Sequence, residues 1–458
     1  MAAGVVSWNN LPSVILYEIF SYLTSKEKIL ASSTCHNWRF ALNHSSFWKN
    51  VHFKMKSSDE DSECRIQYLS SCSSKKLHNA TITFDSINIL CIEQVAKVLE
   101  NIVDNCNLKS LYLKPSNCTI DCPGESEKNK KQYFDRKFYL NLQTLVQQCY
   151  QLEHISFGCL EDFAAYTKPL LESLIKYQHS SIQTIGLATV KYDPDEYVLV
   201  DFDLGLLQNF EMLKIFSLDF DYVNDNLLST LTQVKTLERL VIHVHGISDG
   251  HPGTTEDAWV KLTKNNPRCE LRLSLIHSYD GVDLLHSLIL RRSMPLTHIR
   301  VFFCEQLNCE ALNMLSSYTN TLRSIWWVDS FNSAASNYLL GASDIHYPIN
   351  PFVMCCWRCP GLEELVILGY RYYTEEVYAK TRLRQSLKRL DLAASDMVSF
   401  DNKRADQKTL EELEKEASRL LKQPWKTLSD NDLHSVILNP SAGDSDEFIL
   451  PVVLQDLQ

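Results

Sequence analysis

The sequence is short of the residues that make flexible linkers. It has 13 glycines and 14 prolines among 458 residues, which argues against long flexible connections between its parts. A run of about eighteen apolar residues is nowhere present, so no membrane-spanning helix is expected. No basic region followed by an apolar stretch opens the chain, so we expect no signal peptide. The 15 cysteines then indicate reduced, buried thiols of a cytoplasmic or nuclear protein.

Motifs of the common enzyme classes are also missing. The chain contains no GxxxxGK[ST] loop, no GxGxxG after a strand, no HExxH and no GxSxG. Cys356 and Cys359 form a CxxC pair, but a structural zinc needs a second pair and none lies close by. We therefore expect no catalytic residue, no metal and no cofactor. The alternative is an enzyme whose active site leaves no mark in one sequence.

The charge balance is acidic, with a formal net charge of −11. A surface of this sign repels phosphate backbones, so nucleic-acid binding is not expected. Apolar residues make up 45% and charged residues 22% of the chain, which is ordinary for a globular protein. The length favours two or three modules or an elongated repeat.

Residues 11–23, LPSVILYEIFSYL, predict a helix that is apolar on more than one side. Pro12 suits a first helical turn. Two lines of apolar residues follow at helical spacing: Ile15, Ile19 and Leu23, then Leu16 and Phe20. Thr24 and Glu27 have the spacing of a capping box and open a second helix, and residues 35–42 predict a third. Three short helices cannot enclose this apolar surface, so it needs a partner or the downstream domain.

The same residues resemble the F-box motif over residues 8–52. The matching elements are Leu11-Pro12, Ile19-Phe20 with Leu23, Cys35 with Trp38-Arg39, and Phe47-Trp48. Within that family, the sequence of these residues is similar to that of the F-box only protein 33 and 39 group. Val14 stands where an acidic residue is common and Lys28 where leucine is common, and both departures would weaken adaptor binding.

The resemblance implies binding to the adaptor Skp1 and, through it, to a cullin scaffold. Carried over position by position, the implied Skp1 contacts are Leu11, Pro12, Ile15, Leu16, Ile19, Phe20, Leu23, Trp38 and Trp48, some of which will form the motif's own core. The alternative is a three-helix cap on the downstream domain that binds no adaptor.

A six-residue pattern of three spaced apolar positions recurs ten times after residue 100. It reads LKSLYL at 108, LEHISF at 152, IQTIGL at 182, LKIFSL at 213, LERLVI at 237, RCELRL at 268, LTHIRV at 296, LRSIWW at 322, LEELVI at 362 and LKRLDL at 387, with a weaker LHNATI at 77. This is the strand signature of leucine-rich repeats. We expect an α/β fold in which residues 53–400 form an irregular solenoid of strand–helix units. An ordinary α/β domain with a mixed sheet is the alternative.

The strand register predicts a binding surface. The variable positions between the apolar ones should face the concave side, where arginine and aromatic residues favour binding hot spots. The predicted client-binding residues are Arg272, His298, Arg300, Phe302 and Trp326. Residues 401–458 should form a helix and tail that shield the end of the solenoid, with FILPVVL as a last strand or a docked tail.

These inferences predict a non-catalytic substrate receptor of a Skp1–cullin–F-box ubiquitin ligase. The F-box would hold Skp1 and the repeats a protein client, with neither nucleic acid nor a membrane as partner. A Skp1-binding scaffold without a ligase role is the second hypothesis.

Overall fold

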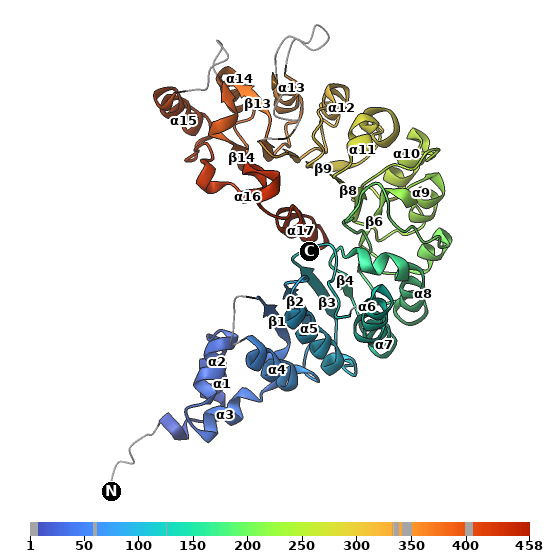
Figure 1. The fold of residues 1–458 in the computed structure, drawn as a ribbon, viewed down its shortest axis with the longest axis vertical. Coiled ribbons are helices and arrows are strands. Elements are labelled where there is room, and N and C mark those ends of the chain that lie inside the picture. The colour runs from blue at the N-terminus through green and yellow to red at the C-terminus, as the bar shows by residue number, and fades with distance from the viewer. Residues whose placement is uncertain are drawn as a thin grey trace.

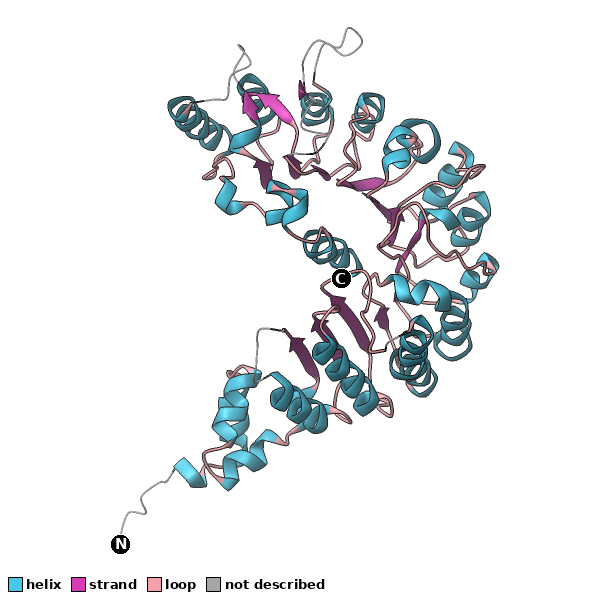
Figure 2. Ribbon diagram, in the orientation of Figure 1, coloured by secondary structure: helices cyan, strands magenta, loops and turns pink. Residues whose placement is uncertain are grey.

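The computed structural model describes residues 8–57, 62–124, 126–331, 333, 339–340, 350–398 and 406–458. It shows a crescent whose strands line the concave side and whose helices cover the convex side (Figures 1 and 2). The N-terminal helices project from one tip of the crescent, whereas the C-terminus lies inside it (Figure 1). Among the described residues, no helix is long and apolar enough to span a membrane.

The projecting part consists of short helices. They are η1 (Trp8–Asn10), α1 (Ser13–Ser21), α2 (Ser25–Ser32), α3 (His36–Leu42) and η2 (Ser45–Trp48). The capping box is confirmed, because the Glu27 amide donates to the Thr24 hydroxyl and the Glu27 carboxylate accepts from the Thr24 amide at 2.7 Å. The Asn37 side chain donates to the Leu11 carbonyl at 2.8 Å, which ties the chain entering α1 to α3.

A sheet of twelve parallel strands, in chain order, forms the concave side. The strands are β1 (Asn50–Met55), β2 (Asn79–Phe84), β3 (Ser110–Pro115), β4 (His154–Ser156), β5 (Thr184–Gly186), β6 (Ile215–Asp219), β7 (Arg239–Val244), β8 (Glu270–Ile276), β9 (Leu296–Phe302), β10 (Ser324–Val328), β12 (Glu364–Leu368) and β14 (Arg389–Leu392). Every predicted repeat segment forms a strand, which confirms the solenoid and makes the mixed-sheet alternative wrong. The sequence pattern missed β1, which begins inside the predicted F-box range.

Helices cover the other face of the sheet. They are α4 (Ser62–Ser73), α5 (Ile89–Ile102), α6 (Glu127–Phe134), α7 (Leu140–Gln148), α8 (Thr167–Gln178), α9 (Asp225–Leu231), α10 (Glu256–Asn265), α11 (Tyr279–Asp283), α12 (Cys309–Leu315), α13 (Pro351–Arg358) and α14 (Thr374–Leu383), with short 3₁₀ and π segments between them. Asn88, Asn224, Thr255 and Asn308 each accept an amide three residues on. These caps satisfy donors that a helix start leaves free, so the turn from each strand into its helix is specified locally.

The core is a ladder of apolar side chains between the strands and the convex helices. Leu240 and Ile242 of β7 are buried, and so are Leu365 and Ile367 of β12. Parallel pairing brings equivalent positions of neighbouring strands side by side, for example Leu240 beside Leu271. Each unit therefore buries its apolar face against the next.

The chain leaves several strands through a left-handed residue. After β12 this residue is Gly369, with φ 83°, and a Cβ there would lie 2.5 Å from the Asp329 carbonyl oxygen. Only glycine fits here, because the backbone at this position passes so close to the backbone at Asp329. Near it, a small second sheet joins β11 (Leu339–Leu340), β13 (Arg371–Tyr373) and β15 (Met397–Val398).

The C-terminal region agrees with the prediction only in part. Helix α15 (Gln407–Leu421) caps the solenoid as expected, because Leu413, Ala417 and Leu421 are buried against the last unit. The segment after Leu428 does not stay at that end. It forms α16 (Ser435–Leu438), α17 (Asp446–Val453) and η12 (Leu454–Leu457), which run back along the concave side (Figure 1). Residues 401–405, the start of the predicted tail, lie outside the described residues.

Replacing Leu240 with alanine tests the ladder. Leu240 is fully buried, so the change should destabilise the protein by about 2–5 kcal/mol through lost contacts and a cavity. The free energy of unfolding in urea measures this. Lys264→Ala on the exposed face of α10 is the control and should change stability by less than about 0.5 kcal/mol. Equal effects would contradict the ladder as the source of stability.

Candidate functional site

The N-terminal helices carry an unusual density of exposed apolar side chains. The large ones are Trp8, Val14, Ile15, Tyr22, Leu30 and Phe40, with exposed fractions from 47% for Ile15 to 80% for Tyr22. Isolated exposed apolar residues are common, but a concentration of them on one small unit marks an interaction surface. These helices therefore offer a candidate protein-binding site.

The predicted Skp1 contacts divide into two groups. Pro12 and Ile15 are exposed, and Leu11, Ile19, Leu23 and Trp38 are half-buried. Leu16, Phe20 and Trp48 are fully buried, so these three are the members of the set that form the motif's own core, and a partner could not reach them. They form the internal core of the unit.

Aromatic packing explains this division. The Phe20 ring lies 5.7 Å from the Phe47 ring and 5.8 Å from the Trp38 ring, centroid to centroid. The Trp48 indole donates to the Leu42 carbonyl at 2.6 Å. The second apolar line of α1 is thus covered by α3 and the residues that follow it, while the first line stays partly open.

The two departures from the F-box pattern have different surroundings. Val14 is exposed. The Lys28 ammonium lies 5.4 Å from the centre of the Phe47 ring, and burial lowers the pKa of Lys28. Lys28 therefore packs as part of the unit and places a positive charge beside its aromatic core.

The predicted client-binding residues lie together on three neighbouring strands. Arg272 is registered with His298 across β8 and β9, and Arg300 with Trp326 across β9 and β10. The Arg300 guanidinium lies 5.9 Å from the centre of the Trp326 ring, and the Arg389 guanidinium stacks at 4.3 Å. The predicted register is therefore correct, but whether these residues bind a client stays a prediction.

The side chains are not open to solvent. Phe302, Arg300 and Trp326 are buried, and Phe302 packs edge-on to Phe448 of α17 at 6.0 Å. The prediction of an accessible concave surface is wrong at these positions, because the returning C-terminal segment covers them.

Asp456 of the same segment lies among the concave arginines. It is fully buried and accepts from Arg272 at 2.6 Å and from Arg300 through two bonds, one of them at 3.1 Å. Burial alone would raise the pKa of Asp456, but Arg300 and Arg272 outweigh it and hold the pKa below its ordinary value. Burial and the same arginines lower the pKa of His298 to about 3, so His298 is neutral at physiological pH.

The sequence contains a helical pattern of apolar residues in this segment, which the search for repeats did not detect. Ile449, Leu450, Val453, Leu454 and Leu457 fall at helical spacing and are all buried. Pro451 interrupts the pattern, which counts against a regular helix when the sequence is considered alone.

A second polar cluster lies at β6 and β7. Asp219, His243 and His245 are close enough to hold a metal ion together. However, the Lys191 ammonium lies 3.2 Å from the Asp219 carboxylate, and both histidines direct a ring nitrogen at the Thr189 carbonyl. Lysine already balances the aspartate, so this cluster fits a structural ion pair and not a metal.

The cysteine motif also fits a structural role. Cys355, Cys356 and Cys359 are buried, free thiols. Burial raises the pKa of Cys356 to about 12 and that of Cys359 to about 11. These thiols are protonated at neutral pH in the folded chain, which makes them poor nucleophiles.

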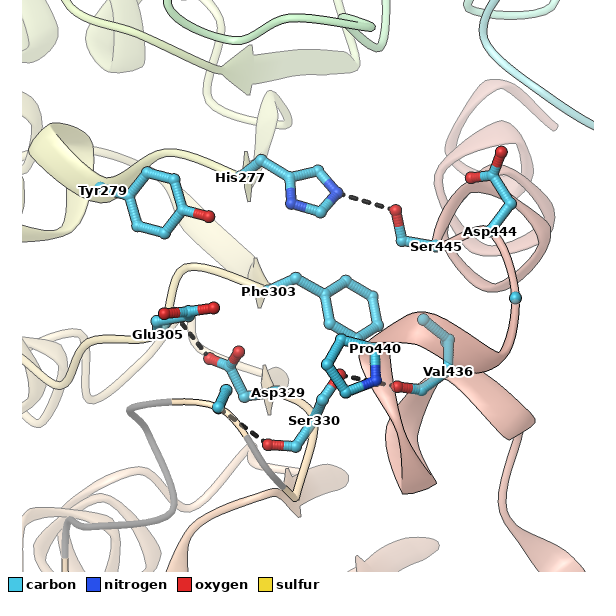
Figure 3. Close-up of a pocket in the computed structure, with 12 residues that line it drawn as sticks. His277, Tyr279, Phe303, Glu305, Asp329, Ser330, Val436, Pro440, Asp444 and Ser445 are labelled. Carbon is cyan, nitrogen blue, oxygen red and sulfur yellow. Dashed lines mark hydrogen bonds between the residues drawn. The ribbon is translucent and has the colours of Figure 1, made fainter.

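A pocket of about 440 Å³ opens between the ends of β8–β10 and the returning segment. Figure 3 shows His277 directed at Ser445 and Asp329 near Glu305. Asp329 accepts from the Tyr370 hydroxyl at 2.7 Å and the Glu305 amide at 2.9 Å. Burial nevertheless raises the pKa of Asp329 to about 7. The Asp329 bonds lie within the repeats, whereas the His277–Ser445 bond joins the repeats to the returning segment.

Asp329 should make stability depend on pH. Because its pKa is near 7 in the folded chain and about 3.9 when unfolded, the folded state binds an extra proton between these values. Stability contributed by this proton is present below about pH 4 and is lost as the pH rises to about 7. Asp329→Asn should remove the dependence, narrowing the difference in unfolding free energy between pH 5 and pH 8 by at least about 1 kcal/mol.

Urea titrations at the two pH values measure the change. Asp430→Asn, at an exposed position, is the control. An unchanged difference in Asp329→Asn would show that other groups cause the pH dependence.

Comparisons with known proteins agree with the N-terminal geometry. Residues 8–54 match the family described as F-box-like. F-box only protein 33 of Homo sapiens and that of Mus musculus are each 22% identical to this chain, over 96% of it and 86% of their own length. This confirms the resemblance to the protein 33 group.

Solved structures are similar only in a general way. The TLR13–ssRNA13 complex has a TM-score of 0.31 and 12% identity over 77% of this chain and 52% of that chain. An internalin from Listeria monocytogenes has a TM-score of 0.29 and 14% identity over 82% of this chain and 85% of that chain.

Proposed function

Because the chain carries an F-box-like domain at residues 8–54 and is similar to F-box only protein 33 along most of its length, we propose that it is the substrate receptor of a Skp1–cullin–F-box ubiquitin ligase. The F-box end binds Skp1, and through Skp1 a cullin, and the solenoid holds a protein client. In this proposal the chain does not itself catalyse the transfer of ubiquitin. It raises the effective concentration of client lysines near the ubiquitin-carrying enzyme, in the cytoplasm or nucleus.

The observation that carries this proposal is the apolar exterior of the N-terminal helices. Val14, Ile15 and Tyr22 of the first helix region are exposed, as are Leu30 and Phe40. Leaving such side chains in water costs about 1.5–3 kcal/mol each compared with burial. A partner that covers them would gain much of this free energy.

The placement of the two surfaces suits a receptor. The N-terminal helices project from one tip of the crescent, away from its concave side (Figure 1). An adaptor on these helices would leave the convex and concave faces of the solenoid uncovered. One chain could therefore hold adaptor and client at the same time.

Replacing Ile15 with glutamate should weaken Skp1 binding. Ile15 is 47% exposed, so a charge there leaves the core intact but must be desolvated in the interface, weakening binding by at least about 2 kcal/mol. Co-expression with Skp1 followed by size-exclusion chromatography and titration calorimetry measures the effect. Phe20, which is fully buried, would be a poor probe because its substitution unfolds the unit.

Val260→Glu is the matched control. Val260 is 49% exposed and lies on α10, far along the chain from the N-terminal helices. It should leave the Skp1 complex unchanged. Skp1 binding of unchanged affinity in Ile15→Glu would contradict the proposed interface, and no complex with the unaltered chain would contradict the receptor function.

A scaffold that binds Skp1 without a ligase role is the second candidate. It is favoured by Lys28, whose half-buried ammonium stands beside Phe47 where the F-box pattern commonly has leucine. Purification of a cullin together with the chain and Skp1 separates the two candidates. The receptor requires the cullin in the complex, whereas the scaffold does not.

A further inference from the structure

The last residues of the chain are fastened to the concave side at successive points. The Ser330 hydroxyl and Phe331 amide donate to the carbonyls of Val436 and Ile437. The Cys118 amide donates to Asp446 at 2.6 Å. The segment therefore passes from the last strands to β3, and η12 then reaches β5 and β6.

Residues 444–458, which we call the return segment, bind as a peptide ligand would. Among the described residues they add no strand to the sheet. Helix α17 has eight residues with Pro451 inside it, so it is too short and too weakly bonded to persist alone. Its apolar residues Ile449, Leu450 and Val453 are buried on the concave side, and docking is what makes it a helix.

The surface is shaped for this occupant. A Cβ on Gly186 of β5 would lie 2.6 Å from a methyl carbon of Leu457. The Arg239 guanidinium donates to the carbonyl oxygens of Asp456 at 2.8 Å and Gln458 at 3.0 Å. The end of the segment thus makes one apolar contact, through Leu457, and hydrogen bonds to an arginine.

Asp456 does not satisfy all the hydrogen-bond donors of the arginines that hold it. Arg239, Arg272 and Arg300 form close ion pairs with two side-chain carboxylates. Asp456 lies at hydrogen-bond distance from Arg272 and Arg300, and Glu270 lies 3.6–3.8 Å from Arg272 and Arg239. The Nε–H groups of all three arginines are buried without an acceptor. The Arg300 side chain is only 7% exposed. Buried donors without partners are costly, so the site would accept a ligand with more anionic oxygens.

From these contacts we infer that the return segment is an intramolecular ligand of the concave face, and that an anionic segment of a client replaces it at Arg239, Arg272 and Arg300. The ligand chemistry is a carboxylate or a phosphate on a peptide with apolar residues before it. A phosphate offers three acceptor oxygens to the arginines. The client part of this inference rests on the proposed receptor function, whereas the exchange of the segment does not.

The test cuts the chain just before the return segment and keeps the segment itself present. A protease site replaces residues 440–443, which are exposed and precede the segment. The probe is a fluorescein-labelled peptide with the sequence of residues 444–458. After cleavage the probe should replace the segment while circular dichroism stays unchanged. Before cleavage it should bind at least about tenfold more weakly, because the tethered segment competes at high effective concentration.

Changes in the probe report on the anionic contact while the protein stays the same. Asp456→Asn in the peptide should weaken binding at least about tenfold, because two arginines lose a charged partner. Gln455→Ala, at an exposed position, is the matched control and should have no effect. A peptide with phosphoserine in place of Asp456 that binds more tightly than the parent indicates a phosphorylated client. Weaker binding indicates a carboxylate client.

Three results would overturn the inference. They are a cut segment that the probe never replaces, a solenoid that unfolds when the segment leaves, and an Asp456→Asn peptide that binds as well as the parent. Hydrogen exchange on the uncut chain gives a second measurement, in which amides of residues 446–457 should open more readily than those of β7 and β8. Skp1 takes no part in these measurements, so their failure is separate from failure of the proposed function.

Discussion

The fold depends on one constraint, which is that no strand–helix unit can bury its apolar face alone. Leu240 is covered only because β6 and β8 pair with β7 on either side and helices close the convex face. The same holds for every interior unit, so stability builds by nearest-neighbour stacking. The regular parallel register follows from it, since a slip by one residue would turn the apolar ladder toward the concave side.

Stacking leaves the two ends of the solenoid to be closed in different ways. At the C-terminal end, α15 lays Leu413, Ala417 and Leu421 over the last unit. At the other end, β1 is joined directly to the helices that carry Trp48. Those helices use Leu16 and Phe20 for their own core and leave Ile15 exposed. The N-terminal unit therefore closes the solenoid and still has a free apolar surface.

The concave side shows how a charge cluster is kept inside a folded chain. Arginines on adjacent strands repel one another in a region that water barely reaches, and their burial is tolerated only with a partner. Asp456 supplies that partner from a distant part of the chain, with Arg300 at the centre of the contact. The return segment thus links the middle repeats to the end of the chain and decides what the concave side presents to solvent.

The repeating strands, the capping box at Thr24 and Glu27, and the F-box pattern could be predicted from the sequence, because each is a local spacing of residue types. The sequence also placed Arg272, Arg300 and Trp326 on the correct face, since side chains alternate along a strand. Which of these side chains are accessible could not be predicted in this way, because it depends on how distant parts of the chain pack together. Leu16 and Phe20 are covered by α3 and the residues after it, and Arg300 and Phe302 are covered by a segment more than a hundred residues away. Burial of this kind depends on contacts between distant parts of the chain, and no local pattern in the sequence records them.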